Sequence, residues 1–454
     1  MRYLPQGQLA NRFLRATGWI VSEHGIGQML RFAGNLVLTR LLAPDMFGVM
    51  AIAHVVISGM TMFSDIGLEL NVIRSKRGND PVFLDTVWTI QILRGLLLFL
   101  VTLCFSLGLY WLNNRDFWPS DSVYQNAELP MIMSLLALSP LIDGFKSTNL
   151  ATANRNLNMS GVAIIQIASQ ASGTLLMIFW AYFDPSVYAL VAGGILARCI
   201  HVLTSHCIIK GHKNRIQWDP KAFEEIFNFG KWIFVTSILG FMILNGDKLI
   251  LGALVDPSTL GLYSLSGSLI AILFGTTNKV VGKVGYAVIS EIGRDSPQRV
   301  KEIYYRIRFP LDGCLLFISG LFFFIGSELV EFLYDERYAY AGHIIEVLSL
   351  ALIIERYMLF SKVLTAIGRP NLNVYINLMG LLCLYVGLPW VHTMYGIEGS
   401  LLFIAFYKVL TIPLIFYYKY HLDLLDVKQE FKVVPFFIIG GSIGYFFTSA
   451  LNSY

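Results

Sequence analysis

Long apolar runs, separated by short polar connections, recur along almost the whole chain. A helix needs roughly 20 mostly apolar residues to cross a bilayer, so each sufficiently long run predicts a membrane-spanning helix. Thirteen runs qualify: residues 16–39, 45–68, 83–112, 129–145, 161–183, 187–209, 232–255, 260–288, 309–330, 341–360, 371–391, 397–418 and 433–451. The pattern therefore predicts an all-α polytopic membrane protein.

The lysines and arginines between these runs alternate between the two sides that the spans define. With a cytoplasmic N-terminus, only Arg40, Arg115 and Arg337 of these connecting cations fall on the outer side. Cytoplasmic loops carry an excess of Lys and Arg, so the alternation predicts a cytoplasmic N-terminus and an outer C-terminus. The thirteenth run is either a helix appended to a twelve-helix core or the last before a fourteenth.

The two halves of the chain resemble each other. A shift of 213 residues places RLLAPDMFGVM, residues 40–50, over ALVDPSTLGLY, residues 253–263, and aligns Pro44 with Pro257. A shift of 215 residues places ATANRNLN over AIGRPNLN. Chance self-alignment of apolar, Gly-rich sequence is the alternative, but separate landmarks agree.

These landmarks lie six spans apart, an even number, so both halves cross the membrane in the same direction. Such repeats are related by an axis along the membrane normal. We therefore expect two six-helix bundles related by a pseudo-two-fold axis, plus about one extra helix. The predicted boundaries are 1–215 for the N-terminal lobe, 216–425 for the C-terminal lobe and 426–454 for an appended transmembrane helix.

Composition agrees with a chain that lies almost entirely in the bilayer. Hydrophobic residues make up 55% and charged residues 14%, whereas soluble domains carry about 25% charged residues. The net charge of +4 is too small to suggest a nucleic-acid partner. The five cysteines include no CxxC pair, and the chain has no Walker A or dinucleotide motif, so we expect no metal site and no cofactor.

Several segments resemble a known transporter family. LTRLLAPDMFGVMAIAHVV (38–56), followed by FSDIGLELNVIRS (63–75), resembles the start of the polysaccharide transporter family. These are Wzx-type lipid-linked oligosaccharide and O-antigen flippases of the multidrug/oligosaccharidyl-lipid/polysaccharide exporter superfamily. NGDKLILGALVDPSTLGLYSLSGSL (245–269) resembles that family's seventh and eighth helices. The resemblance covers essentially the whole chain.

This resemblance implies a V-shaped pair of bundles around a central cavity. It implies that the protein moves an undecaprenyl-pyrophosphate-linked glycan from the inner to the outer leaflet of the bacterial cytoplasmic membrane by alternating access. The glycan would serve O-antigen, capsule or exopolysaccharide biosynthesis. Membrane lipids and the lipid-linked glycan are the expected partners, with the polymerase and chain-length regulator of the same pathway as further candidates. We expect a monomer that is not an enzyme.

Charged side chains inside predicted spans are the candidate transport residues, because a charge there is costly and tends to face water or a partner. Cations outnumber acids in these spans, which suits a pyrophosphate headgroup that needs charge-assisted donors. The predicted substrate-binding residues are Arg31, Asn35, Arg94, Arg198, Asn245, Lys248, Lys279, Lys283 and Arg356.

Most of these residues also have a structural interpretation. Arg31 lies about two helical turns after Glu23 and could form a buried pair with it. Lys248 could pair with the adjacent Asp247. Lys279 and Lys283 could extend to the inner interface, and for Arg198 and Arg356 a structural ion pair explains the charge as well as a substrate contact does.

The acids suggest two further roles. Glu23 and Asp247 are the clearest acids inside spans and are the candidates for coupling to protons or sodium. Asp65, with the nearby basic residues Arg74 and Lys76, suggests an inner gate or a network that anchors the loop.

Two other functions compete with flipping. A cation-coupled multidrug exporter of the same superfamily would need a more acidic cavity than this excess of cations suggests. A membrane-embedded glycan polymerase or ligase would need a large polar outer loop, and the longest predicted one, residues 113–128, is short.

Overall fold

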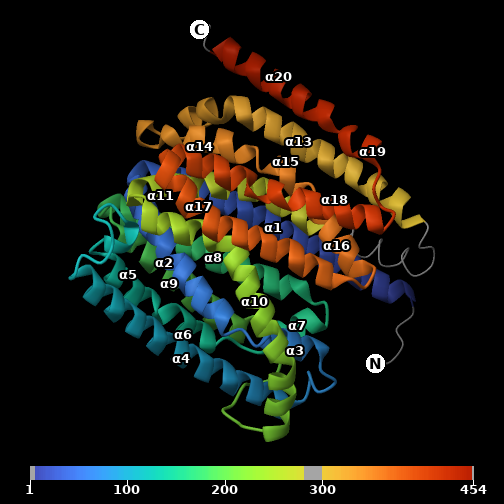
Figure 1. The fold of residues 1–454 in the computed structure, drawn as a ribbon. Coiled ribbons are helices and arrows are strands. Elements are labelled where there is room, and N and C mark those ends of the chain that lie inside the picture. The colour runs from blue at the N-terminus through green and yellow to red at the C-terminus, as the bar shows by residue number, and fades with distance from the viewer. Residues whose placement is uncertain (1–5, 281–298, 452–454) are drawn as a thin grey trace. The chain divides into compact units, whose positions relative to one another are not determined.

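A computed structural model of the chain describes residues 6–280 and 299–451, and every regular element in these ranges is a helix. The chain divides into two compact units, Met1–Met242 and Ile243–Tyr454, and Figure 1 labels their helices. The predicted lobe boundaries and the pseudo-two-fold relation between the halves stay predictions.

The first unit contains the helices up to the first part of α10. They are α1 (Gln6–Leu41), α2 (Pro44–Phe63), α3 (Leu68–Arg74), α4 (Pro81–Asn113), η1 (Val123–Gln125), α5 (Leu129–Leu136), α6 (Leu138–Gly144), α7 (Asn149–Arg155), α8 (Met159–Phe183), α9 (Val187–Cys207) and α10 (Pro220–Leu254).

The second unit contains the end of α10 and the remaining helices. They are α11 (Pro257–Val280), α13 (Val300–Leu333), η4 (Glu336–Tyr338), α14 (Tyr340–Ser349), α15 (Leu352–Glu355), α16 (Met358–Ala366), α17 (Pro370–Phe406), η5 (Tyr407–Thr411), α18 (Ile412–His421), α19 (Val427–Phe431) and α20 (Val434–Leu451).

Proline marks the starts of several of these helices. Pro44 and Pro257 begin α2 and α11, each a few residues after the preceding helix ends, and Pro220 begins α10. Proline suits a first helical turn because its fixed φ is helical and its missing N–H would have no partner there. The Asp80 side chain caps α4 by accepting a hydrogen bond from the Val82 N–H at 3.1 Å. The sequence therefore sets these boundaries locally.

The apolar helices confirm a multi-pass membrane protein. In the described ranges, eight helical segments are long and apolar enough to span a bilayer, or nine if the bent pair Leu129–Gly144 and Asn149–Arg155 is one span. One such segment, Asn371–His421, contains two of the predicted runs, and its helix is broken at Gly396, where φ is +61°. The run 341–360 is divided among α14, α15 and α16. The total of thirteen spans stays a prediction.

Glycines allow close helix packing in both units. In the first unit α8 packs along α9, and a Cβ on Gly173 would lie 2.7 Å from the carbonyl oxygen of Gly193. In the second unit α20 lies along α13 (Figure 1). A Cβ on Gly320 would lie 2.1 Å from the Phe437 carbonyl oxygen, and one on Gly440 would lie 2.1 Å from that of Phe317. Small residues are typical of helix contacts in membranes, where backbones approach closely.

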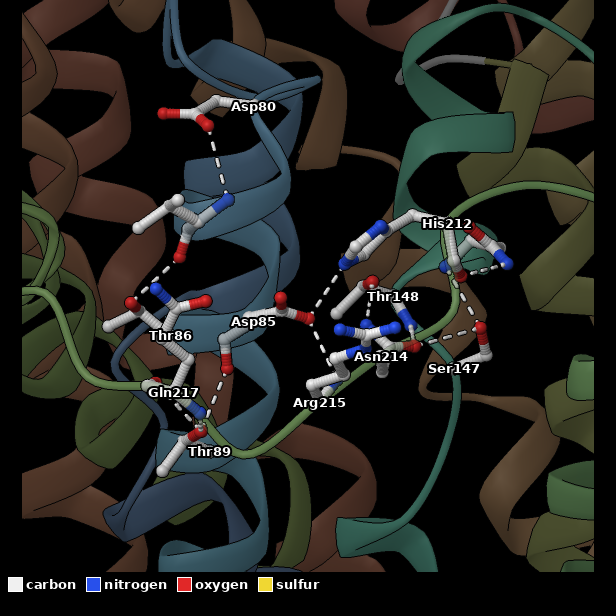
Figure 2. A network of polar contacts seen from close by, with 12 residues as sticks. Asp80, Asp85, Thr86, Thr89, Ser147, Thr148, His212, Asn214, Arg215 and Gln217 are labelled. Carbon is white, nitrogen blue, oxygen red and sulfur yellow. Dashed lines mark hydrogen bonds and ion pairs between the residues drawn. The ribbon is translucent and has the colours of Figure 1, made fainter.

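The segment between α9 and α10 is extended and lies along α4 (Figure 2). Asp85 Oδ1 accepts a hydrogen bond from the Arg215 N–H at 2.8 Å and lies 2.7 Å from His212 Nε2. One helical turn later, Thr89 Oγ1 donates to the Gln217 carbonyl at 2.9 Å and accepts from the Gln217 N–H at 3.0 Å. The side chains of α4 thus supply the partners that an extended backbone cannot find within itself.

The opposite side of this segment is held in the same way. The Asn214 amide donates to Thr148 Oγ1 at 2.6 Å and accepts from Ser147 Oγ at 3.2 Å (Figure 2). Asn149 donates to the His212 carbonyl at 3.0 Å. Residues 208–219, named here the linker, are therefore fixed in position by the first unit.

Candidate functional site

A cavity of about 670 Å³ lies within the first unit. Its walls come from α1, α2, α6, α8 and α9, and they combine small residues with polar and charged ones. Three cations line it, Arg31, Lys146 and Arg198, together with a single carboxylate, that of Asp143. The cavity is therefore suited to an anion, and it is named here the cationic cavity.

Arg31 enters the cationic cavity from α1 with its side chain exposed. Among the described residues it forms no ion pair or hydrogen bond, and Glu23 does not pair with it. The predicted Asn35 lies one turn further along α1 and also lines the cavity. The Arg31 guanidinium thus keeps its donors for a bound anion, and such donors can hold a phosphate oxygen pair in two parallel hydrogen bonds.

Arg198 reaches the same cavity from α9 and forms an ion pair with Asp143 of α6. The two side chains are 37% and 36% exposed. A pair this open to solvent contributes about 0–1 kcal/mol. An incoming anion can therefore compete with Asp143 for Arg198 at small cost, so the structural and substrate-binding interpretations of Arg198 are compatible.

Lys146, which follows the predicted run 129–145, is not among the predicted substrate-binding residues but lines the cationic cavity. It follows the bend after α6, which Gln91 of α4 holds by donating to the carbonyls of Gly144 and Lys146, both at 2.9 Å. The only local signal was the Asp143-x-x-Lys146 spacing at the end of an apolar run. The bend that places this cation beside Arg198 is tertiary.

A neighbouring cavity of about 540 Å³ shares Asp143 and Lys146 with the first and is also lined by Arg94 and Asp65. Arg94 is tethered there, because its Nε donates to Ser64 Oγ at 2.9 Å and its Nη2 donates to the Thr61 carbonyl at 2.6 Å. It satisfies the end of α2, where carbonyls lack helical partners. Arg94 is therefore a weaker candidate for substrate binding than Arg31.

The predicted gate residues make contacts within the first unit. Asp65 Oδ1 accepts a hydrogen bond from the Gly67 N–H at 2.8 Å. The Arg74 guanidinium lies 4.3 Å from the ring centroid of Phe229 in α10, and Lys76 is exposed. These contacts fit the loop-anchoring interpretation, and a gating role stays a proposal.

Arg77, next to this group, joins the loop before α4 to the linker. Its Nη2 donates to Asp80 at 2.9 Å and to Asp219 at 2.8 Å. The hydrogen bond from Arg77 lowers the pKa of the Asp219 carboxyl below its ordinary value. Asp219 therefore stays ionised at neutral pH, where it precedes the first turn of α10.

In the second unit the predicted residues Asn245, Asp247 and Lys248 lie on α10, and together with Gly246 they are named here the polar notch. Asp247 accepts a hydrogen bond from the hydroxyl of Tyr263 on α11. Gly246 lies against Tyr385 of α17, and a Cβ added to Gly246 would lie 2.8 Å from the Tyr385 hydroxyl oxygen. Lys248 is half-buried, and within the described part of the chain it has no ion-pair partner, Asp247 included. Asn245, also half-buried, lies one turn earlier.

The guanidinium of Arg356 contacts two groups of the second unit. Its Nη1 donates to the Glu430 carbonyl at 3.1 Å and its Nη2 donates to the Tyr357 hydroxyl at 3.0 Å. The neighbouring Glu355 pairs with Lys408 of η5. Lys283 lies outside the described residues, and the structure does not describe the side chain of Lys279.

A buried charge cluster at the start of α13 was not anticipated from the sequence. Arg308 Nη1 lies 2.6 Å from Glu430 Oε1, Arg308 Nε lies 2.7 Å from Asp312 Oδ2, and Lys419 Nζ lies 2.7 Å from Glu430 Oε1. The four side chains are at most 4% exposed. Only the Arg308/Asp312 spacing of four residues was readable as a helical pair. The cluster joins α13, α18 and α19.

The described residues contain no group of three or more His, Cys, Asp or Glu side chains that could hold a metal ion. The chemistry that the cavities offer is anion binding and charge pairing.

The chain is similar to proteins of polysaccharide export. A family described as "Polysaccharide biosynthesis protein" matches residues 37–341. The putative O-antigen transporter of Shigella flexneri is 21% identical over 398 residues, which cover 84% of this chain and 91% of that protein. The amylovoran biosynthesis protein AmsL of Erwinia amylovora is 22% identical over 270 residues, 58% of this chain and 68% of AmsL.

Solved transporters share the fold. The lipid II flippase MurJ, in an inward closed conformation, superposes with a TM-score of 0.67 at 13% identity, covering 96% of this chain and 98% of MurJ. An inward-facing multidrug resistance MATE family transporter of the MOP superfamily superposes with a TM-score of 0.65 at 12% identity, covering 87% of this chain and 94% of that one.

Proposed function

Because this chain belongs to the polysaccharide biosynthesis protein family, we propose that it is a flippase for undecaprenyl-pyrophosphate-linked oligosaccharide repeat units. It moves them from the inner to the outer leaflet of the bacterial cytoplasmic membrane by alternating access, for O-antigen, capsule or exopolysaccharide biosynthesis. The relatives named for O-antigen transport and amylovoran biosynthesis support this assignment, and so does the fold shared with the lipid II flippase.

The observation that carries the proposal is the cationic cavity. Three cations face one carboxylate, and Arg31 has no partner among the described residues. A pyrophosphate bound there would receive charge-assisted hydrogen bonds from Arg31 and Lys146 and would compete with Asp143 for Arg198. Asn35, which also lines the cavity, offers a neutral donor to the first sugar, whereas the Gln170 amide donates to the Gly27 carbonyl at 2.7 Å.

The polar notch of the second unit suits a coupling role. Lys248 supplies a further cation, and Asp247, which accepts from Tyr263, supplies an acid that can exchange a proton or bind sodium. Glu23 of α1 is the second candidate acid. The membrane potential also favours outward movement of an anion, by about 2.3 kcal/mol per charge for each 100 mV.

The function is tested in a deletion strain by measuring surface glycan and the leaflet that holds the lipid-linked repeat unit. A flippase predicts loss of surface glycan with the lipid-linked unit retained on the cytoplasmic leaflet. Normal glycan with increased drug sensitivity would instead indicate the multidrug exporter. Single repeat units on the outer leaflet would indicate a polymerase or ligase, and either result would refute the proposal.

The site is tested by complementation with Arg31→Ala and Lys248→Ala. We expect each variant to express normally and to abolish surface glycan. Arg15→Ala is the matched control, since Arg15 is an exposed arginine on the same helix as Arg31 but does not line the cationic cavity. Wild-type glycan levels with Arg31→Ala would remove Arg31 from the site.

A further inference from the structure

A second basic cavity lies in the second unit, and none of its lining residues was assigned to transport. It has a volume of about 590 Å³ and is formed by the first turns of α13 and by the segment that contains α19. Its cations are Lys301 and Arg306 from α13 and Lys432, which directly follows α19, and Phe309 lies beside them. Its carboxylates are those of Glu302 and Asp426.

The wall of this cavity is fixed by Tyr305. Its hydroxyl donates to Glu430 Oε1 at 2.8 Å and accepts from the Asp426 N–H at 3.0 Å. The Asp426 carboxylate is occupied as the cap of α19, where it accepts from the Gln429 N–H at 3.2 Å. The two sides of the cavity are thus held together by the hydrogen bonds of Tyr305, of which the one to Glu430 is buried.

The cations form few direct ion pairs. Arg306 and Lys432 are exposed, and within the described ranges neither forms an ion pair. Lys301 has only a distant contact, 3.9 Å from the carboxylate of Asp423, whose side chain is fully exposed. The lining also holds two carboxylates, of which Asp426 caps α19 and Glu302 is exposed. Three cations against two carboxylates leave an excess of positive charge that favours a bound anion.

The cavity also lies where both helices change from polar to apolar. In α13 the basic segment ends at Phe309 and a long apolar run follows, and in the C-terminal segment Lys432 directly precedes Val433 and the apolar α20. Lys432 Nζ lies 5.3 Å from the Phe309 ring centroid. Phe309 and Val434 are 37% and 40% exposed. A basic pocket flanked by exposed apolar side chains is typical of sites for lipid headgroups at the membrane interface.

We propose that this cavity binds the phosphodiester headgroup of an anionic phospholipid. Lys301 and Arg306 hold the phosphate from α13, Lys432 holds it from the C-terminal segment, and an acyl chain follows the exposed apolar surface beside Phe309. Free phosphate offers the same headgroup chemistry without the acyl chain, so the test separates the two. The bound lipid bridges α13 and α19 and stabilises the attachment of α20.

The test uses the purified full-length chain, delipidated in detergent, and titrates it with dioleoylphosphatidylglycerol or dioleoylphosphatidylcholine under native mass spectrometry. The wild type should bind one phosphatidylglycerol tightly and phosphatidylcholine weakly. Loss of one charge-assisted contact costs roughly tenfold in affinity, so Arg306→Gln with Lys432→Gln should weaken phosphatidylglycerol binding by about a hundredfold.

Two further variants keep the result interpretable. Lys428→Gln is the matched control, because Lys428 is an exposed lysine of α19 that does not line the cavity; it should bind like the wild type. Arg306→Lys should retain most of the affinity. Melting of each apo variant checks folding independently of lipid.

Equal phosphatidylglycerol affinity for the double variant and the wild type would overturn the proposal. So would displacement of the lipid by millimolar inorganic phosphate, since that identifies a phosphate site, and so would equal binding of phosphatidylcholine. These outcomes are independent of whether the protein flips a glycan.

Discussion

Replacing Glu430 with Gln tests whether the buried charge cluster holds the C-terminal helices. Glu430 is 1% exposed, and its carboxylate contacts Arg308 at 2.6 Å and Lys419 at 2.7 Å. Glutamine has nearly the same size, so the substitution removes the negative charge and leaves the packing almost unchanged. Any loss of stability then reports on the charge.

The size of the effect follows from the charges in the cluster. In the wild type Glu430 and Asp312 oppose two buried cations, Arg308 and Lys419. Glu430→Gln leaves both cations facing Asp312 alone. Removal of one partner from a buried pair costs about 3–5 kcal/mol, because a charge stays buried without compensation. Adding Lys419→Met restores the balance and leaves the Arg308–Asp312 pair, so the double variant should lose less than the single one.

The measurement is thermal unfolding in detergent, combined with limited proteolysis of a C-terminally tagged chain. Glu430→Gln should lower the melting temperature and release a fragment that contains α20. Asp423→Asn is the control, because Asp423 is fully exposed and lies outside the cluster. If Glu430→Gln melts like Asp423→Asn, or if the double variant is less stable than the single one, the charge-balance argument is refuted.

Three further predictions concern other contacts. Asp143→Asn should lower the melting temperature little, since the pair of Asp143 with Arg198 is exposed. It should also tighten the binding of a pyrophosphate lipid analogue, because Arg198 is freed. Unchanged affinity for the analogue in a binding assay would contradict the predicted role of Arg198. Asp85→Ala removes two linker contacts. It should lower the free energy of unfolding by about 1–3 kcal/mol and speed tryptic cleavage of the linker. Wild-type cleavage rates would argue against anchoring of the linker by Asp85. Gly320→Leu should overpack the α13–α20 contact and lower the free energy of unfolding by about 1–3 kcal/mol, which thermal melting would detect. Gly267→Ala, with open space around it, should leave the melting temperature unchanged.

The sequence predicted the helical, membrane-embedded nature of the chain and many helix boundaries. The runs 45–68 and 161–183 correspond to α2 and α8, and Pro44, Pro220 and Pro257 begin helices. Such features are readable because a bilayer forces backbone groups to pair within their own segment. Length, hydropathy and a starting proline are all local properties of the chain.

The sequence also indicated Arg31 and Asn35 as polar positions on one helix, and both line the cationic cavity. It gave no reason to place Lys146 beside them, because that position depends on the bend that Gln91 holds. Likewise, it gave no reason to expect that Arg356 donates to a backbone carbonyl of α19 and a tyrosine hydroxyl, and substrate binding by Arg356 stays a prediction.

The choice between a free cation and a paired one was decided only by the tertiary structure. Arg31 and Arg198 are equivalent as arginines within apolar runs, yet Arg31 has no partner in the described part of the chain and Arg198 pairs with Asp143, 55 residues away in sequence. The Arg308–Glu430 pair spans 122 residues. A span is determined by the solvent around its own residues, whereas a charge pair depends on which helices pack together, and hydropathy alone does not encode that packing.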